Sequence, residues 1–245
     1  MRVTVIGTGY VGTVTGACLA YFGHRVTCAD TDAHKIEKLR RGEMPIYEPY
    51  LDQLLQLAAA RGGIDFTTEL AAPAAESDVI FIAVGTPPLE TGEANLCYLE
   101  AAARGIGAAM DDSKFRVVVN KSTVRVGSGN LVEVLVQRGH RGRAPGQSEG
   151  HPLRRASNPE FLREGSAIAD SLYPDRIVGG EPVFPDSITA RQSIVVRPSR
   201  EITQRRSPAV RQRCSTKIGR FMRPLRAEHT RLPQRIVSAG FCGNH

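Results

Sequence analysis

Short apolar runs and amphipathic stretches alternate along the first 140 residues of the chain. β-branched and apolar runs predict strands at 2–7, 25–29, 64–67, 78–84 and 116–120. Apolar residues at helical spacing predict helices at 10–22, 33–41, 49–61, 96–110 and 128–138. The run at 78–84 is continuously apolar, which indicates burial on both faces, as in a parallel sheet. This alternation predicts an α/β fold with a doubly wound parallel sheet.

The pattern weakens after residue 139 and changes in character at about residue 180. From 181 to 245 there are 13 Lys and Arg against 4 Asp and Glu, a net charge of +9, whereas residues 1–180 have 19 against 21, a net charge of −2. The same stretch contains six prolines, which interrupt any long helix. We therefore expect a domain over 1–180, followed by a poorly ordered, disordered basic tail over 181–245.

A glycine-rich turn, GTGYVG, joins the first predicted strand to the first helix. It matches G-x-G-x-x-G, and this strand–turn–helix context makes the match informative. Gly7 would permit the tight turn, Gly9 would let a pyrophosphate approach the backbone, and Gly12 would let helix and strand pack closely. The amides of Tyr10 and Val11 would then face the anion at the helix N-terminus. The alternative is an ordinary turn with incidental glycines.

An acidic residue, Asp30, ends the second predicted strand, 23 residues after Gly7. A carboxylate there can accept hydrogen bonds from both ribose hydroxyls of NAD, and it would repel the 2′-phosphate of NADP. We therefore predict NAD as the cofactor of a Rossmann-like domain. The alternative role for Asp30 is to cap the next helix. Lys35 either flanks the adenosine ribose or is a solvated surface lysine.

Small and polar residues also follow the later strands, at the edge where open α/β sheets bind ligands. Thr86 follows strand 78–84 and Thr123 follows strand 116–120, and each hydroxyl can donate and accept hydrogen bonds. Helix capping is the alternative role for both threonines.

Two carboxylates, Glu160 and Glu164, lie four residues apart in the sequence. If 160–170 is helical, both lie on one face. Such a pair near a nicotinamide could order a water molecule or act as a general base. Stabilisation of a helix N-terminus is the alternative role for Glu160.

Several stretches together resemble one enzyme family. VIGTGYVG, Asp30, AVGTPP, KSTV, SNPEFLREGSAI and YPDRIV, spread over about 1–180, are similar to UDP-glucose 6-dehydrogenase and its UDP-mannose and GDP-mannose dehydrogenase relatives. The resemblance implies a cytoplasmic, homodimeric oxidoreductase that uses two NAD to oxidise a sugar-nucleotide alcohol to a carboxylate. Oxidation of UDP-glucose to UDP-glucuronate is the reaction predicted, with another sugar nucleotide (UDP-ManNAc, GDP-mannose) as the alternative.

The resemblance also implies roles for individual residues. Thr123 and Glu160 match positions tied to a catalytic water and to thioester hydrolysis. The positions expected to line the NAD site are Val11, Asp30, Lys35, Thr86, Thr123 and Glu164. The positions expected to border the UDP-sugar are Glu160, Phe161, Leu162, Arg163 and Glu164.

Some of the family's features are missing from this sequence. Arg125 stands where the family's KSTVPVGT has proline, and the residues 152–155 (PLRR) stand where it has an apolar strand. The cysteine motif GFGGxCFPKD is absent, and Cys214 and Cys242 lack its neighbours; the family's central dimer helix is not found either. Since the second oxidation needs an enzyme thiolate, we do not expect the full reaction of this chain alone. We hypothesise that the residues from about 181 onward are not the family's sequence, because their arginine-, serine- and proline-rich composition is of the kind that out-of-frame translation of a GC-rich gene gives.

The competing functions are a non-catalytic NAD-binding fragment and nucleic-acid binding through the basic tail. The tail has few aromatic residues for base stacking, so no nucleic-acid partner is expected. No run approaches ~20 apolar residues, and the N-terminus lacks a signal-peptide layout, so we expect a cytoplasmic protein without a membrane partner. The five cysteines form no CxxC pair, which argues against a disulfide framework or a metal site, and Cys18 and Cys28 are expected in the core.

Overall fold

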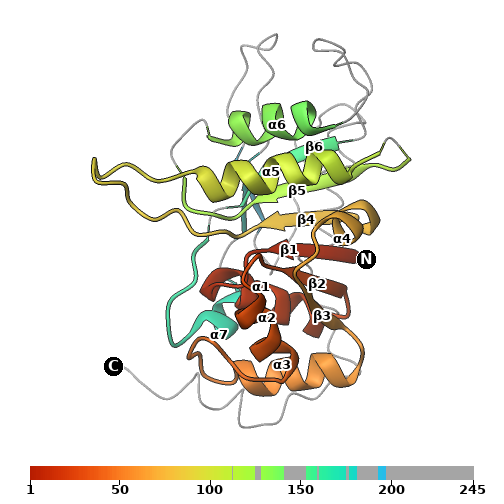
Figure 1. Cartoon of the computed structure of the whole chain (residues 1–245). Coiled ribbons are helices and arrows are strands. Elements are labelled where there is room, and N and C mark those ends of the chain that lie inside the picture. Colours follow the sequence, from red (N-terminus) through yellow and green to blue (C-terminus); the bar gives the residue numbers. More distant parts are fainter. Residues whose placement is uncertain are drawn as a thin grey trace.

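A single mixed sheet runs through the chain, in the strand order β3-β2-β1-β4-β5-β6-β7-β8. The computed structural model describes residues 1–111, 113–124, 128–140, 153–158, 160–174, 177–180 and 193–196 (Figure 1). Its strands are β1 (Arg2–Ile6), β2 (Arg25–Ala29), β3 (Ile64–Thr67), β4 (Val79–Ile82), β5 (Arg116–Asn120), β6 (Leu153–Ser157), β7 (Ile177–Gly180) and β8 (Ser193–Val196).

The strands from β3 to β6 are parallel, whereas β7 and β8 are antiparallel to their neighbours. The chain runs outward from β1 through β2 to β3 and then returns to place β4 on the other side of β1. This reversal is the switch point of a doubly wound sheet, beside which dinucleotides bind. The predicted fold class is therefore confirmed.

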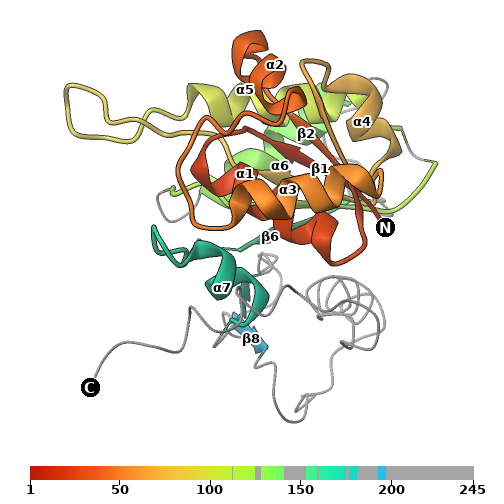
Figure 2. The same cartoon turned by 90° about the horizontal axis from the view of Figure 1, so that it is seen from below.

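Helices cover both faces of this sheet (Figures 1 and 2). They are α1 (Tyr10–Tyr21), α2 (Ala33–Arg40), α3 (Leu51–Ala60), α4 (Ala71–Glu76), α5 (Cys97–Ala109), α6 (Ser128–Gly139) and α7 (Ala167–Leu172). On β5, Val117 and Val119 pack into one core cluster with α1, α3 and α7, and Val118 packs into a second cluster with α4, α5 and α6. Successive side chains thus alternate between two cores, as the continuously apolar strands predicted.

Most predicted elements lie within one or two residues of the observed bounds. Helix α4 was not predicted. Helix α1 was expected to bury one apolar face, but every residue from Gly12 to Ala20 is buried because the sheet, α3 and α7 surround it. Residues 153–155 of the unusual PLRR sequence still begin strand β6, which pairs with β5, and Ala156 of this strand supplies an apolar residue to the core.

One strand lies inside the predicted tail. Residues Ser193–Val196 form β8, which pairs with β7, within the stretch that was predicted to be a poorly ordered tail. Their SIVV sequence is apolar and β-branched, which favours a strand. The remainder of the predicted tail lies outside the described residues.

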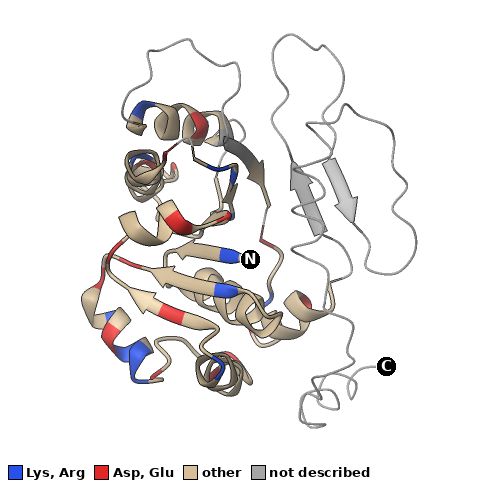
Figure 3. Ribbon diagram, turned by 90° about the vertical axis from the view of Figure 1, so that its right-hand side faces the viewer, with Lys and Arg blue, Asp and Glu red and all other residues tan. Residues whose placement is uncertain are grey.

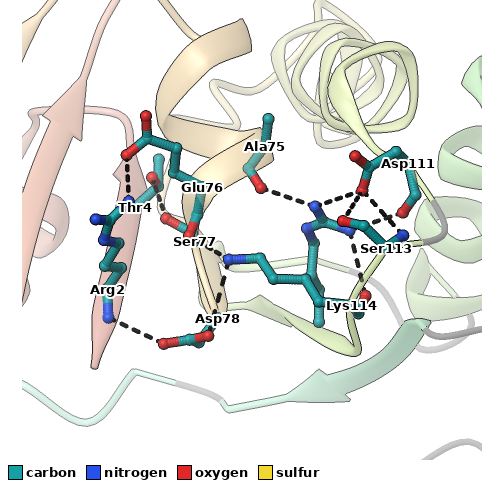
Figure 4. Close-up of polar contacts among 10 residues, drawn as sticks. Arg2, Thr4, Ala75, Glu76, Ser77, Asp78, Asp111, Ser113 and Lys114 are labelled. Atoms are coloured by element: carbon teal, nitrogen blue, oxygen red, sulfur yellow. Dashed lines mark hydrogen bonds and ion pairs between the residues drawn. The ribbon is translucent and has the colours of Figure 1, made fainter.

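A polar cluster joins the amino ends of the strands, at the edge opposite the glycine-rich turn (Figure 4). The Arg116 guanidinium, 2% exposed, donates to the carbonyls of Ala75 and Asp111, each at 2.7 Å, and to the Asp111 carboxylate at 2.8 Å. Arg2 pairs with Glu76 at 2.6 Å, and both of these side chains are more than half exposed. Basic residues begin three of the strands here, balanced by acidic residues in the adjoining loops (Figure 3).

Candidate functional site: the carboxyl edge of the sheet

The three glycines of the turn after β1 have three distinct environments. Gly7 has φ +97°, and a Cβ there would lie 2.5 Å from the Ala83 carbonyl oxygen. A Cβ at Gly12 would lie 1.9 Å from the Gly7 oxygen. A Cβ at Gly9 would meet no atom within 4 Å. The protein's own packing therefore requires glycine at positions 7 and 12, while the space beside Gly9 is open.

The N-terminus of α1 carries backbone donors that the helix itself does not use. The first intrahelical bond runs from the Thr13 amide to the Gly9 carbonyl, so the N–H groups of Tyr10, Val11 and Gly12 precede the hydrogen-bond ladder. Among the described residues, no side chain caps α1 and no acidic residue lies in its first turn. The helix dipole favours an anion at this position. The open space at Gly9 and these donors together fit a pyrophosphate.

The carboxylate of Asp30 is held in place at the end of β2. Its Oδ2 accepts hydrogen bonds from the Thr8 amide and the Thr8 hydroxyl, both at 2.7 Å, and its Oδ1 accepts from the Asp32 amide at 3.0 Å. Partial burial acts to raise the pKa of Asp30, but the bonds from Asp32 and Thr8 outweigh it, and the pKa lies below its usual value. The group is therefore a fixed anion beside the glycine-rich turn.

The capping role considered for Asp30 belongs to Asp32 instead. The Asp32 carboxylate accepts from the His34 and Lys35 amides at the start of α2, at 3.0 and 3.2 Å. The Lys35 ammonium lies 3.6 Å from the Asp32 carboxylate in a half-exposed ion pair, and its charge also acts to lower the pKa of Asp30. Asp30 therefore does not cap α2, and Lys35 lies close to Asp30.

Side-chain hydrogen bonds join the loops that follow β4 and β5 at the carboxyl edge of the sheet. The Thr86 hydroxyl donates to the Thr123 carbonyl at 2.8 Å, so the two predicted threonines lie side by side. The Ser122 hydroxyl donates to the Val84 carbonyl at 2.8 Å, which joins the same two loops deeper in the site. Helix α5 begins at Cys97 and α6 at Ser128, so neither threonine caps a helix.

A buried lysine lies beneath these loops. Lys121, 9% exposed, follows β5 and donates to the Asn158 side-chain oxygen at 3.3 Å. Burial lowers the pKa of Lys121 to about 8, while the nearby charge of Glu160, and secondarily Cys18, favours the protonated form. Lys121 and Asn158 belong to the KSTV and SNPE motifs, but their side chains were not predicted to meet.

The helical pairing expected for Glu160 and Glu164 is wrong. Residues 160–163 form no regular structure, residues 164–166 form a turn, and the helix begins only at Ala167. Gly165 has φ +86°, a left-handed conformation that stops a helix from running through this segment. The Glu160 carboxylate instead accepts from the Leu162 amide at 2.7 Å, which folds it back onto its own chain.

The residues expected to border the sugar nucleotide have different environments. Phe161 is 55% exposed, whereas Leu162 packs against the core. The Arg163 guanidinium makes a two-pronged ion pair with Asp170 of α7, at 2.7 and 3.1 Å. Arg163 therefore braces the segment against α7.

One residue of the site, Glu48, was missed by sequence reasoning. It lies in the loop between α2 and α3, is 5% exposed, and hydrogen-bonds the segment at 165–167 and the Tyr10 hydroxyl. Its only signal in the sequence is a glutamate between Tyr47 and Pro49, in a loop where an exposed carboxylate is the ordinary expectation.

The fold and the glycine-rich turn define a dinucleotide-binding domain. The chain belongs to the UDP-glucose/GDP-mannose dehydrogenase family, because residues 1–190 match the model of the family's NAD binding domain. The predicted resemblance and the predicted cofactor, NAD, are thereby confirmed. The match extends ten residues past the boundary expected at residue 180. None of the described helices combines the length and apolar character needed to cross a bilayer.

Similar proteins include enzymes for more than one sugar nucleotide. The chain is 46% identical over 179 residues to UDP-glucose 6-dehydrogenase TuaD of Bacillus subtilis (73% of this chain, 37% of that protein). It is 48% identical over 181 residues to UDP-glucose 6-dehydrogenase of Rhizobium meliloti (74% and 39%). Among solved structures, a GDP-mannose dehydrogenase ternary complex from Pseudomonas aeruginosa is similar with a TM-score of 0.69 and 38% identity (74% and 41%). The chain thus spans about two fifths of the length of these relatives.

Proposed function

We propose that this chain provides the NAD site of a dehydrogenase that oxidises the primary alcohol of UDP-glucose. The observation that carries the proposal is the pairing of an open approach at Gly9 with a fixed anion at Asp30. The UDP-glucose 6-dehydrogenases at 46% and 48% identity support the choice of substrate. When bound, NAD supplies a hydride acceptor, and the residues of this chain bind and orient it.

The proposed cofactor contacts follow the carboxyl edge. The amides of Tyr10 and Val11 bind the pyrophosphate, and Asp30 accepts from the adenosine ribose, with Lys35 alongside. A carboxylate has about four acceptor positions, and three are used, so one position on Oδ1 is ready for a ribose hydroxyl. A second ribose hydroxyl would compete with the Thr8 hydroxyl for Oδ2.

The nicotinamide end of the bound cofactor is proposed to lie near Thr86, Thr123 and Glu160. The hydrogen bond between Thr86 and Thr123 fixes the two loops on which a nicotinamide would rest. Thr123 and Glu160 would orient a water molecule, and buried Lys121 lies near Glu160. Glu164 and the Phe161–Arg163 stretch would border the sugar nucleotide.

A second candidate substrate is another sugar nucleotide. The structural likeness to GDP-mannose dehydrogenase, at 38% identity, supports it. Because the sequence lacks the GFGGxCFPKD motif, we expect this chain alone to bind NAD without completing the oxidation.

Calorimetric titration of the 245-residue chain with NAD and with NADP tests the cofactor site. We expect NAD to bind and NADP to bind at least about tenfold more weakly, because Asp30 repels the 2′-phosphate. Absence of NAD binding would refute the proposal. A parallel assay of NADH formation with UDP-glucose or GDP-mannose distinguishes a non-catalytic module, which binds NAD without turnover, from an active dehydrogenase.

A further inference from the structure

Glu48 is a buried carboxylate whose two oxygens are both occupied by donors from distant parts of the chain. Its Oε1 accepts from the Ala167 amide at 2.8 Å. Its Oε2 accepts from the Gly165 amide at 2.8 Å and from the Tyr10 hydroxyl at 2.5 Å. All three donors are uncharged. No ion pair joins Glu48 to a basic side chain within the part of the chain that the structure describes, and a buried carboxylate is costly unless such hydrogen bonds compensate it, so its placement calls for an explanation.

These bonds join the two halves of the proposed site. Tyr10 is the first residue of α1, and its amide faces the proposed pyrophosphate position. Gly165 and Ala167 end the segment that carries Phe161–Glu164, which has no regular structure of its own. Helix α7 lies beside α1, so the two donors from the segment reach the same carboxylate as the Tyr10 side chain (Figure 2).

The segment depends on contacts of this kind for its position. The bond from the Leu162 amide to Glu160 and the bond from Arg163 to Asp170 are made within the segment and α7, so they shape the segment without attaching it to the cofactor turn. The Tyr10 hydroxyl also lies 3.5 Å from the Arg163 carbonyl, a longer contact. Burial and the hydrogen bond to Glu48 both raise the pKa of Tyr10, so its hydroxyl remains a donor.

We infer that Glu48 is a positioning residue that couples the cofactor turn to the sugar-nucleotide segment at 160–167. The inference rests on the proposed function and extends it: NAD bound at the Tyr10 amide orders α1's first turn, and Glu48 transmits that order to the Gly165 and Ala167 amides. The expected consequence is that NAD slows hydrogen exchange across 160–167 through Glu48.

The test compares the 245-residue chain with its Glu48→Gln and Tyr10→Phe variants. Hydrogen exchange of residues 160–167 is measured with and without saturating NAD, together with urea unfolding and NAD affinity. Gln has the same shape, but its NH2 group cannot accept from an amide, so it loses at least one of the three bonds. Tyr10→Phe removes only the hydroxyl and leaves both backbone bonds to Glu48. Glu43→Gln, in the same loop but exposed and paired with Arg41, is the matched control.

In the wild type we expect NAD to slow exchange at 160–167 by about tenfold or more, the effect of one charge-assisted hydrogen bond. In the absence of NAD, Glu48→Gln should speed exchange at 160–167 by more than its loss of global stability accounts for. It should also abolish the slowing of this exchange by NAD. Tyr10→Phe should abolish the slowing by NAD but leave exchange without NAD unchanged. Glu43→Gln should change neither the exchange rate without NAD nor the slowing by NAD. If Glu48→Gln binds NAD and retains the wild-type NAD effect, the inference is refuted. Failure of the wild type to bind NAD would instead refute the proposed function.

Discussion

The Gly9→Ala substitution separates cofactor binding from folding at a single atom. Gly9 has φ −70° and ψ −170°, an extended conformation that alanine adopts without strain, and its added Cβ would meet no protein atom within 4 Å. Alanine restricts the unfolded chain, which stabilises the protein by about 0.4–1 kcal/mol. Alanine is also a poorer N-cap than glycine by a similar amount. The two effects oppose each other, so the free energy of unfolding should change by less than about 1 kcal/mol.

The effect on NAD should be much larger. The methyl group would occupy the space through which the pyrophosphate approaches the amides of Tyr10 and Val11. Hydrogen bonds to a charged group are worth about 1.5–3 kcal/mol each. Loss of one such bond weakens binding by at least about tenfold, and loss of both by more than a hundredfold. Calorimetric titration with NAD, alongside urea unfolding followed by circular dichroism, measures both quantities in one preparation.

The Gly12→Ala variant is the contrasting control. Its Cβ would lie 1.9 Å from the Gly7 oxygen and 2.9 Å from the Gly7 carbonyl carbon, both backbone atoms that cannot move aside cheaply. We expect it to destabilise folding by about 1–3 kcal/mol or more, as overpacked sites do. If folded Gly9→Ala protein binds NAD as tightly as the wild type, then the pyrophosphate does not approach Gly9 and the reasoning is wrong.

Three further predictions concern the fold, the choice of cofactor and the buried lysine. Arg116→Met should lower the free energy of unfolding by about 3–5 kcal/mol, because it leaves the carbonyl partners of Arg116 without their donor. Arg2→Met, at the exposed ion pair, should lower the free energy of unfolding by less than about 1 kcal/mol. Equal effects of the two substitutions in urea unfolding would contradict this prediction. Asp30→Asn should weaken NAD binding about tenfold and narrow the preference over NADP, and an unchanged ratio in the two titrations would remove Asp30 as the determinant. The pKa of Lys121 is lowered to about 8 in the folded chain, below its unfolded value of about 10.5, so the unfolded state binds more protons between these pH values. The stability of the wild type relative to Lys121→Met should therefore rise from pH 8 to 10.5, and a flat difference would show that Lys121 is not buried as a charge.

The cofactor half of the site was predictable because its determinants are local. The glycine spacing, the start of α1 and the carboxylate after β2 all lie within residues 7–30, and each depends on backbone geometry that sequence patterns report directly. The meeting of Thr86 with Thr123 was also implied, since parallel neighbours bring their carboxyl ends to one edge. The sequence did not indicate which of Asp30 and Asp32, two residues apart, caps α2 and which lies beside the glycine-rich turn.

The substrate half was less predictable because its contacts are distant in sequence. The interpretation of Glu160 and Glu164 assumed a helix, and the backbone conformation of Gly165 prevents it. Glu48 bonds to residues 117 and 119 positions later, a pairing that no local pattern encodes. A glutamate in a polar loop is ordinarily solvated, and only the approach of α7 to α1 buries this one.

The two halves of the site nevertheless share one hydrophobic core. Ala156 of β6 and Ala167, Ile168 and Leu172 of α7 belong to the same buried cluster as the residues of β1 and α1. The segment at 160–166 is therefore held at both ends by the core that supports the glycine-rich turn, and Glu48 adds a polar bond between these anchors. Because helix α7 packs into this core, a boundary before residue 165 would expose the core residues that α7 covers and leave Glu48 without its two backbone donors. The NAD-binding unit thus extends through α7, and the segment proposed to border the sugar nucleotide is part of that unit.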